Sequence, residues 1–321
     1  MVNRRSFAKQ VVGYLPVYAT AASIAQGGWA QQTLPARGGQ GSQPGERQYP
    51  PGRGPFDGSP VGSQLPGQKW LVHDHSRPQP RKVTPGQPIP TMSAPSDAIV
   101  LFDGKDLSKW NAATFGGRGG RGGRGPQQAP PAQAPPPPQQ PTEPQWRIVD
   151  GHAEMRGGIV TKESFGDIQL HLEWMTPPVE DPMRVGQRRG NSGIVFMGRY
   201  EVQVLSSYDN ITYADGGAGA MYGVYPPMVN PCMPEGQWNT FDFVFEAPRF
   251  DGEKVVKPAF LTLFFNGVMV HNRAQFLGAT AREPLASYTP HEPELPFQLQ
   301  GHVGPAWYRN IWVRRILGYD A

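Results

Sequence analysis

Residues 189–205, RGNSGIVFMGRYEVQVL, hold two runs that are typical of β-strands. In the second run, residues 200–205, apolar and polar side chains alternate strictly, and neighbouring side chains of a strand point to opposite faces. Glu201 and Gln203 therefore share one face, and the valines between them share the other. The preceding turn, residues 190–193, has the composition of a tightly hydrogen-bonded turn. The stretch predicts a strand pair that presents polar groups on one side.

The same alternation recurs along the chain at a spacing that predicts an all-β fold. Residues 168–175 place apolar side chains on one face and His171 and Glu173 on the other. Asp150-Gly151 and Asn266-Gly267 are hairpin signals. Many short strands with frequent turns indicate an antiparallel sandwich. We expect strands at 99–102, 146–149, 152–155, 159–161, 168–175, 193–197, 200–205, 238–246, 259–265, 268–271, 296–300 and 306–316.

Composition divides the 321 residues into one folded domain and several low-complexity segments. Gly (40) and Pro (37) exceed their average usage, and both concentrate outside the alternating runs. The single cysteine, Cys232, excludes an intrachain disulfide framework and a multi-cysteine zinc site. We predict an export signal at 1–30, a disordered spacer at 31–68, an extended arm packed on the domain at 69–95, and a β-sandwich at 96–318 with a disordered insert at 116–144.

The N-terminus has the features of a secretory signal of the twin-arginine type. Arg4-Arg5 precedes Ser-Phe, and a weakly apolar run, residues 11–25, leads to small residues suited to cleavage. This run is short and is interrupted by Gly13 and Pro16, so we expect no stable membrane insertion. The signal predicts a bacterial protein in the periplasm or outside the cell.

Gly-Gly-Arg repeats within residues 116–144 raise the possibility of RNA binding, because charge and flexibility suit single strands. An exported protein does not meet RNA in the cytoplasm. We therefore interpret the repeats as a loop insertion and expect no nucleic-acid partner.

Large hydrogen-bonding side chains line the polar faces of several predicted strands. This composition suits carbohydrate, since amides, carboxylates and arginine satisfy sugar hydroxyls. Polar alternation is also expected on any solvated outer face of a sandwich, so each residue taken alone has a structural explanation. Taken together, they predict a groove, with candidate substrate-binding residues Asn191, Ser192, Gln203, Tyr222, Gln300 and Arg309.

Three residues are candidates for the chemistry. Glu173 and Glu201 are a possible acid and base pair, as in glycoside hydrolysis, although the sequence does not fix their separation. His302 is the strongest single candidate for a base, because imidazole titrates near neutral pH. A buried structural histidine is the alternative for His302.

Metal ligands are a weaker interpretation of two segments. Asp209, Asn210 and Asp215 offer oxygen ligands for a divalent metal such as Ca²⁺, but their spacing is irregular. His73-Asp74-His75 in the arm has the side chains for a metal, although local hydrogen bonding explains them better. The sequence identifies no certain cofactor, and a divalent metal such as Ca²⁺ is the one candidate.

An ordered set of motifs gives the chain a family resemblance. It resembles the 3-keto-disaccharide hydrolase domain family over residues 96–316. The motifs that carry it are LFDGKDLSKW (101–110), WRIVDG (146–151), GNSGI (190–194), YEVQVL (200–205), GAMYGVYPP (219–227), GQWNT (236–240) and LQGHVGPAWYRNI (299–311). The loop at 177–189, the insert, and Gly301, where Asp is common, depart from the pattern.

The resemblance implies a concanavalin A-like jelly roll that cleaves glycosides whose sugar is oxidised to a ketone at carbon 3. Elimination followed by hydration, or net hydrolysis, would then be the reaction. On this basis we expect His302 to act as the base and Arg309, Gln203 or Asn191 to stabilise an enolate. We expect Glu173 or Glu201 to bind hydroxyls or to assist the leaving group. A carbohydrate-binding module without chemistry and a surface interaction protein are the alternatives.

Overall fold

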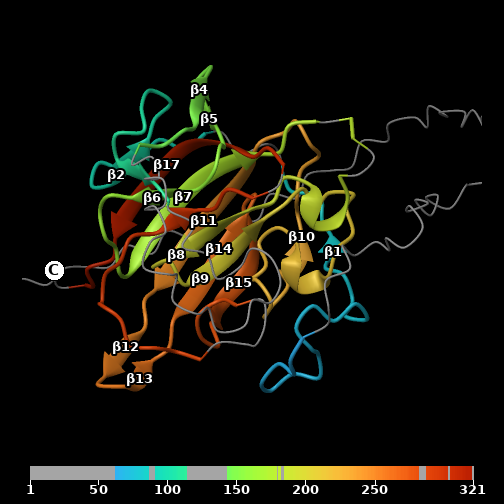
Figure 1. The fold of residues 1–321 in the computed structure, drawn as a ribbon, viewed down its shortest axis with the longest axis vertical. Helices are drawn as coiled ribbons and strands as arrows, with labels where there is room; N and C mark the ends of the chain where they lie inside the picture. Colours follow the sequence, from blue (N-terminus) through green and yellow to red (C-terminus); the bar gives the residue numbers. More distant parts are fainter. Residues whose placement is uncertain are drawn as a thin grey trace, which may run out of the picture. The chain divides into compact units, whose positions relative to one another are not determined.

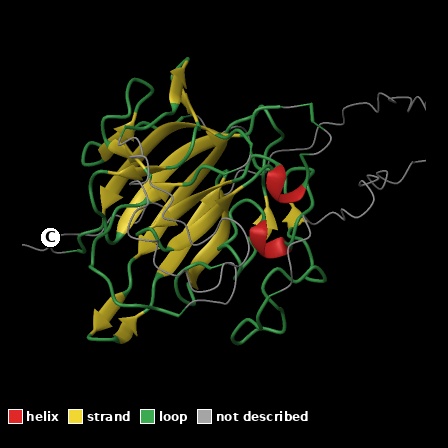
Figure 2. Cartoon of the chain, in the orientation of Figure 1, coloured by secondary structure: helices red, strands yellow, loops and turns green. Residues whose placement is uncertain are grey.

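The computed structural model describes residues 62–86, 91–113, 143–178, 180–181, 184–281, 287–302 and 304–319. The predicted export signal and nearly all of the predicted insert lie outside these residues. Two antiparallel sheets dominate the described chain (Figures 1 and 2). This arrangement is the antiparallel sandwich of the jelly-roll class that the alternation and the resemblance predict.

The larger sheet has eight strands in the order β15-β14-β11-β7-β17-β5-β4, with β2 paired to β17. All of its pairings are antiparallel. Its strands are β2 (Ile99–Phe102), β4 (Arg147–Val149), β5 (His152–Glu154), β7 (Ile168–Met175), β11 (Asn239–Glu246), β14 (Phe260–Phe265), β15 (Val268–Gln275) and β17 (Trp307–Arg315).

The smaller sheet has five strands in the order β3-β6-β16-β8-β9. They are β3 (Trp110–Ala112), β6 (Ile159–Thr161), β16 (Gln298–Leu299), β8 (Ser192–Phe196) and β9 (Tyr200–Val204). The sequence stretch 189–205 therefore forms the β8–β9 hairpin at one side of this sheet.

Two hairpins follow directly from their turn residues. Asp150 and Gly151 have φ of 46° and 78°, and Asn266 and Gly267 have φ of 49° and 74°. Both central residues of a type I′ turn need positive φ, which Asn, Asp and Gly tolerate best. These turns join β4 to β5 and β14 to β15, as the sequence predicts.

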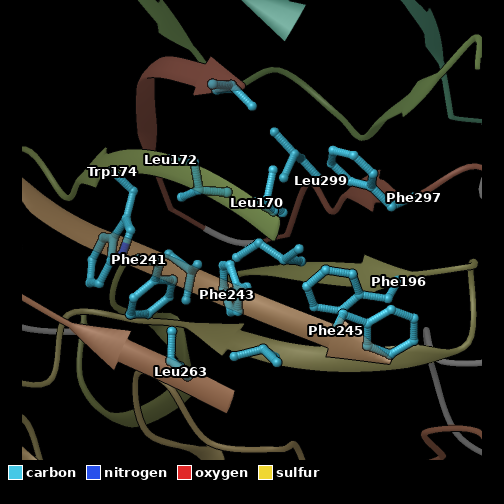
Figure 3. Close-up of a cluster of buried hydrophobic side chains, with 14 of the residues drawn as sticks. Leu170, Leu172, Trp174, Phe196, Phe241, Phe243, Phe245, Leu263, Phe297 and Leu299 are labelled. Carbon is cyan, nitrogen blue, oxygen red and sulfur yellow. The ribbon is translucent and has the colours of Figure 1, made fainter. Parts of the chain in front are cut away.

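The core lies between the facing sides of the two sheets (Figure 3). Phe196 of the smaller sheet stacks on Phe245 of the larger one, with ring centroids 4.5 Å apart. Fully buried side chains such as these each contribute about 1.5–3 kcal/mol through loss of apolar contact with water. The apolar residues of each strand thus fix which residues face outward.

Residues 62–65, at the end of the predicted spacer, form backbone hydrogen bonds with Trp70 and Val72 of the predicted arm. The arm's strand β1 (Arg81–Lys82) pairs in parallel with β10 (Val229–Asn230). Figure 2 shows the short helical turns η1 (Gly186–Arg188) and η2 (Ala214–Gly216) beside this pair. A separate hairpin consists of β12 (Arg249–Asp251) and β13 (Lys254–Lys257).

Candidate functional site

Three polar side chains gather on the outer face of the smaller sheet. Val202 and Val204 belong to the core, so Glu201 and Gln203 point to the opposite side of β9. Gly193 of the neighbouring strand β8 pairs with Gln203. The backbone N–H of Gln300 donates to the Gly193 carbonyl, which places Gln300 on the other flank. We call Gly193, Glu201, Gln203 and Gln300 the Gly193 site.

The glycine at the centre of this site leaves space that its neighbours use. A Cβ atom at Gly193 would lie 2.7 Å from Glu201 Oε1 and 2.9 Å from Gln300 Oε1. Both distances are shorter than real Cβ contacts. The two oxygens therefore lie over the glycine, and any larger residue would displace them.

Glu201 is a buried carboxyl group with a perturbed pKa. Glu201 is only 9% exposed. Burial raises the pKa of Glu201 to about 7, and a hydrogen bond with Gln300 offsets this only in part. Among the described residues no cation acts on it. Glu201 can therefore hold or release a proton near neutral pH.

Amide side chains connect the site to the loop before β8. Gln203 Nε2 donates to Gln187 Oε1 over 3.0 Å, and Asn191 Nδ2 donates to the same oxygen over 3.0 Å. Gln187 lies in the loop at 177–189, where strand alternation gives no information, and the sequence analysis did not select it. The only signal in the sequence was a glutamine three residues before the Gly-Asn-Ser-Gly turn.

Tyr222 lies next to the site on the segment that extends the smaller sheet. Its backbone N–H donates to the Glu201 carbonyl over 3.2 Å. Its hydroxyl is 2.7 Å from that of Tyr213, whose ring lies 3.9 Å from the ring of His73 in the arm. The arm therefore supports this side of the site.

His302 follows Gln300 by two residues and is exposed. The surrounding chain still crowds the imidazole enough to lower its pKa through loss of water contact. The intervening Gly301 packs so closely on Gly157 that a Cβ would overlap the Gly157 carbonyl carbon. This contact leaves no space for a larger side chain at position 301.

The structure does not bring Glu173 or Arg309 to the Gly193 site. They lie on β7 and β17 of the larger sheet, where they are paired in register. Leu172 and Trp174 on either side of Glu173 belong to the core, so Glu173 faces outward from the larger sheet. The expected convergence of Glu173 with Glu201 is therefore wrong, because the two strands belong to opposite layers.

Glu173 instead belongs to a paired cluster, which we call the Glu173 cluster. Arg309 Nε donates to Glu173 Oε2 over 2.7 Å, and Asn310 Nδ2 donates to Oε1 over 3.0 Å. His171 Nδ1 lies 2.7 Å from Asp242 Oδ1. The sequence places Asn310 on the face opposite Arg309, but a bulge with φ of 47° at Asn310 turns both toward Glu173.

Ser192 points into the sandwich rather than outward. Its hydroxyl donates to the Gln300 carbonyl over 2.5 Å and accepts a hydrogen bond from the Tyr308 hydroxyl over 2.6 Å. Ser192 therefore connects the two sheets at the edge of the site. It offers no group to a ligand on the outer face.

The candidate calcium ligands have separate partners. Asp209 pairs with Arg189, Asn210 bonds to the backbone of Gly186, and Asp215 accepts the N–H of His73. In the described segments, no group of three or more His, Cys, Asp or Glu side chains is placed to hold a metal ion. The described part of the chain also contains no helix long and apolar enough to cross a membrane.

Two solved structures are similar to this chain. A candidate glycosyl hydrolase from Parabacteroides distasonis ATCC 8503 is 34% identical, covers 78% of this chain and 99% of its own, and superposes with a TM-score of 0.60. A second candidate glycosyl hydrolase from that organism is 16% identical over 68% of this chain and 94% of its own, with a TM-score of 0.45. No functionally curated protein matches.

A family model gives the most direct assignment. The model described as the 3-keto-alpha-glucoside-1,2-lyase-like domain matches residues 97–314. This match covers the sandwich and both polar faces but not the arm at 62–86. The chain therefore belongs to the 3-keto-alpha-glucoside-1,2-lyase-like, or 3-keto-disaccharide hydrolase, domain family.

Proposed function

We propose that this protein cleaves glycosides whose sugar carries a ketone at carbon 3, and that the reaction takes place at the Gly193 site. The observation that carries the proposal is Glu201, a buried carboxyl whose pKa of about 7 suits proton transfer. Family membership supplies the substrate class. The amides around Glu201 supply the hydrogen-bonding capacity that a sugar requires.

The ketone determines the chemistry. It acidifies the hydrogen on carbon 2, and a base removes that hydrogen as a proton to leave an enolate. The electrons then form the bond between carbons 1 and 2, the bond from carbon 1 to the leaving oxygen breaks, and that oxygen gains a proton. Addition of water to the resulting double bond completes a net hydrolysis.

Two residues have properties that suit the proton transfers. His302 is exposed and its lowered pKa keeps the imidazole neutral, so we assign it the removal of the carbon 2 proton. Glu201 in its protonated form donates to the leaving oxygen. Arg309 has no part in this scheme, because it lies on the other sheet.

Release of the aglycone from a chromogenic 3-keto-glucoside tests the proposal. The wild type should release it, and the unoxidised glucoside should remain intact because its carbon 2 hydrogen is not acidic. His302→Ala should lower kcat by about 10²–10⁴-fold, as removal of a general base does. Gln169→Leu, on the outer side of β7 in the larger sheet, is the matched control and should keep full activity.

A non-catalytic carbohydrate-binding module is the second candidate. It is favoured by Gln203 Oε1 and Gln300 Oε1, which are buried and have no hydrogen-bond partner among the described residues. Calorimetry separates the two functions. Binding of the 3-keto-glucoside without release of its aglycone would overturn the enzyme proposal and support the module.

Export is a further part of the proposal. Arg4-Arg5 and the apolar run after it support a periplasmic or extracellular location. A reporter fused to residues 1–30 should reach the periplasm in a bacterial host, and replacing Arg4 and Arg5 by lysine should retain it in the cytoplasm. Equal distribution of both reporters would contradict export by this signal.

A further inference from the structure

Gln187 has a side-chain orientation that its neighbours determine. It is 7% exposed, and its Nε2 donates to the Gly216 carbonyl over 2.8 Å and to Thr212 Oγ1 over 2.9 Å. A backbone carbonyl only accepts hydrogen bonds, so the nitrogen of Gln187 must face Gly216. The Gln187 oxygen consequently faces Gln203 and Asn191.

This orientation determines the orientation of Gln203 in turn. Because Gln187 Oε1 can only accept, Gln203 must turn its NH₂ group toward it. The same NH₂ group donates to Asn191 Oδ1 over 3.3 Å. The NH₂ group of Gln203 therefore already donates to two acceptors, Gln187 Oε1 and Asn191 Oδ1. The amide oxygen of Gln203 consequently points away from these two residues.

The oxygen that remains is an unusual feature of a buried residue. Gln203 is 1% exposed, and its Oε1 has no hydrogen-bond partner among the described residues. Buried acceptors without a partner are costly, and native structures contain few of them. Gln300 Oε1 is in the same condition, over Gly193. The site therefore presents acceptors that lack donors.

We infer that Gln187 is a positioning residue that holds Gln203 as a hydrogen-bond acceptor for a hydroxyl group of the sugar. This role differs from the enolate stabilisation expected of Gln203, since an enolate oxygen needs a donor. The inference rests on the proposed function only for the identity of the sugar. Its ligand class is a sugar with a free hydroxyl that donates into the site.

Binding of a carbon-linked glycoside of 3-keto-glucose tests the inference, because its aglycone cannot leave whether or not the protein is an enzyme. Calorimetry compares this ligand with its 2-, 4- and 6-deoxy analogues. For the wild type, one analogue should bind about tenfold more weakly, because the hydroxyl group that it lacks is the one that donates to the Gln203 oxygen. In Gln187→Leu, that ratio should approach one, since Gln203 is then free to rotate.

Matched variants keep this test decisive. Gln187→Glu retains an oxygen toward Gln203 and Asn191 and should preserve the tenfold ratio in part. Gln169→Leu, on the larger sheet, should preserve it fully. Gln203→Leu gives the same comparison if Gln187→Leu does not fold, and its ratio should also approach one.

Two results would overturn the inference. One is an unchanged deoxy ratio in folded Gln187→Leu and Gln203→Leu. The other is saturable binding of Ca²⁺ alone that Gln203→Leu abolishes, which would assign the acceptors to a cation. Failure of the proposed function has a different signature, because aglycone release would be absent while the deoxy ratio still responded to the variants.

Discussion

Two buried glutamates, one on each outer face of the sandwich, differ in their electrostatic environment. Glu173 is 2% exposed, and although burial alone would raise its pKa, the nearby His171 and hydrogen bonds from Asn310 and Arg309 lower it to about 2. Glu201 is 9% exposed, and burial raises its pKa to about 7. One carboxyl is permanently charged and paired, whereas the other is close to its titration point.

The difference shows which of the two faces has capacity left for a ligand. In the Glu173 cluster, the carboxylate has a donor on each oxygen and holds β7 to β17 at the bulge of Asn310. Those hydrogen bonds explain the residues without any ligand. In the Gly193 site, Gln203 Oε1 and Gln300 Oε1 are not satisfied by the described residues. We therefore place binding and chemistry on the smaller sheet and structural support on the larger one.

The largest predicted effect separates the two glutamates by activity. Glu201→Gln should lower kcat for a 3-keto-glucoside by about 10²–10⁴-fold, because an amide cannot transfer a proton. Glu173→Gln should change kcat by less than about threefold in the fraction that remains folded. Stopped-flow measurement of aglycone release checks both. Equal losses in the two variants would break the functional distinction between the two faces.

The next effect reverses the comparison and concerns stability. Glu173→Leu leaves Arg309, Asn310 and His171 without their shared acceptor, and loss of one member of a buried ion pair costs about 3–5 kcal/mol. Urea denaturation at pH 7 measures the change in the free energy of unfolding. Glu201→Leu is the matched variant and should be nearly neutral or stabilising, since it removes an unpaired buried carboxyl. A loss below about 1 kcal/mol for Glu173→Leu would contradict the structural role.

Sequence alternation could predict the strands and their faces but not the sheet to which each strand belongs. Residues 168–175 were predicted as a strand and form β7, and the turn at Asn266-Gly267 forms the expected hairpin. Alternation predicts which side of its own strand Glu173 occupies, but not which sheet that strand joins. Its position opposite Glu201 depends on long-range pairing of β7 with β11 and β17, which no local pattern encodes.

The same limit explains the residues within the site. Glu201 and Gln203 share a face because both lie at outward positions of β9, and Gln300, which directly follows β16, joins them through its backbone hydrogen bond to Gly193. Gln187 reaches them from a loop, where side-chain direction has no period. The bulge at Asn310 also interrupts the period, because one extra residue reverses the alternation after it.

The third prediction concerns the pH dependence of stability. Glu201 has a folded pKa of about 7, above its ordinary value of 4.5, so the folded state binds more protons between these values. The contribution of Glu201 to the free energy of unfolding is therefore fully present below pH 4.5. It decreases by on the order of 3 kcal/mol as the pH rises to 7. Glu201→Gln should remove this fall, as thermal unfolding from pH 4.5 to 7.5 measures.

The Glu173 cluster provides the contrasting pH window. Burial would lower the pKa of His171, but the hydrogen bond to Asp242 and the nearby negative charge of Glu173 outweigh it and raise the pKa to about 9. Its contribution is complete below pH 6.5 and declines as pH rises through 9. Asp242→Asn should therefore weaken the fall above pH 6.5 and leave the fall below pH 7 that belongs to Glu201. If Asp242→Asn and Glu201→Gln changed the pH dependence of stability in the same way, the assignment of separate pH windows to His171 and Glu201 would be wrong.

The smallest predicted effect concerns the space at the centre of the Gly193 site. Gly193→Ala places a methyl group 2.7 Å from Glu201 Oε1 and 2.9 Å from Gln300 Oε1, so both side chains must move. Both contacted atoms are the ends of flexible side chains, so the loss of stability should stay at or below about 1 kcal/mol, the low end for overpacking. Gly217→Ala is the control, because its Cβ would lie 3.6 Å from Ser207 Oγ, an ordinary contact. Since the Glu173 cluster is remote from the added methyl, the pH dependence assigned to His171 should persist in Gly193→Ala, whereas that of Glu201 should shift as the carboxyl is displaced toward water.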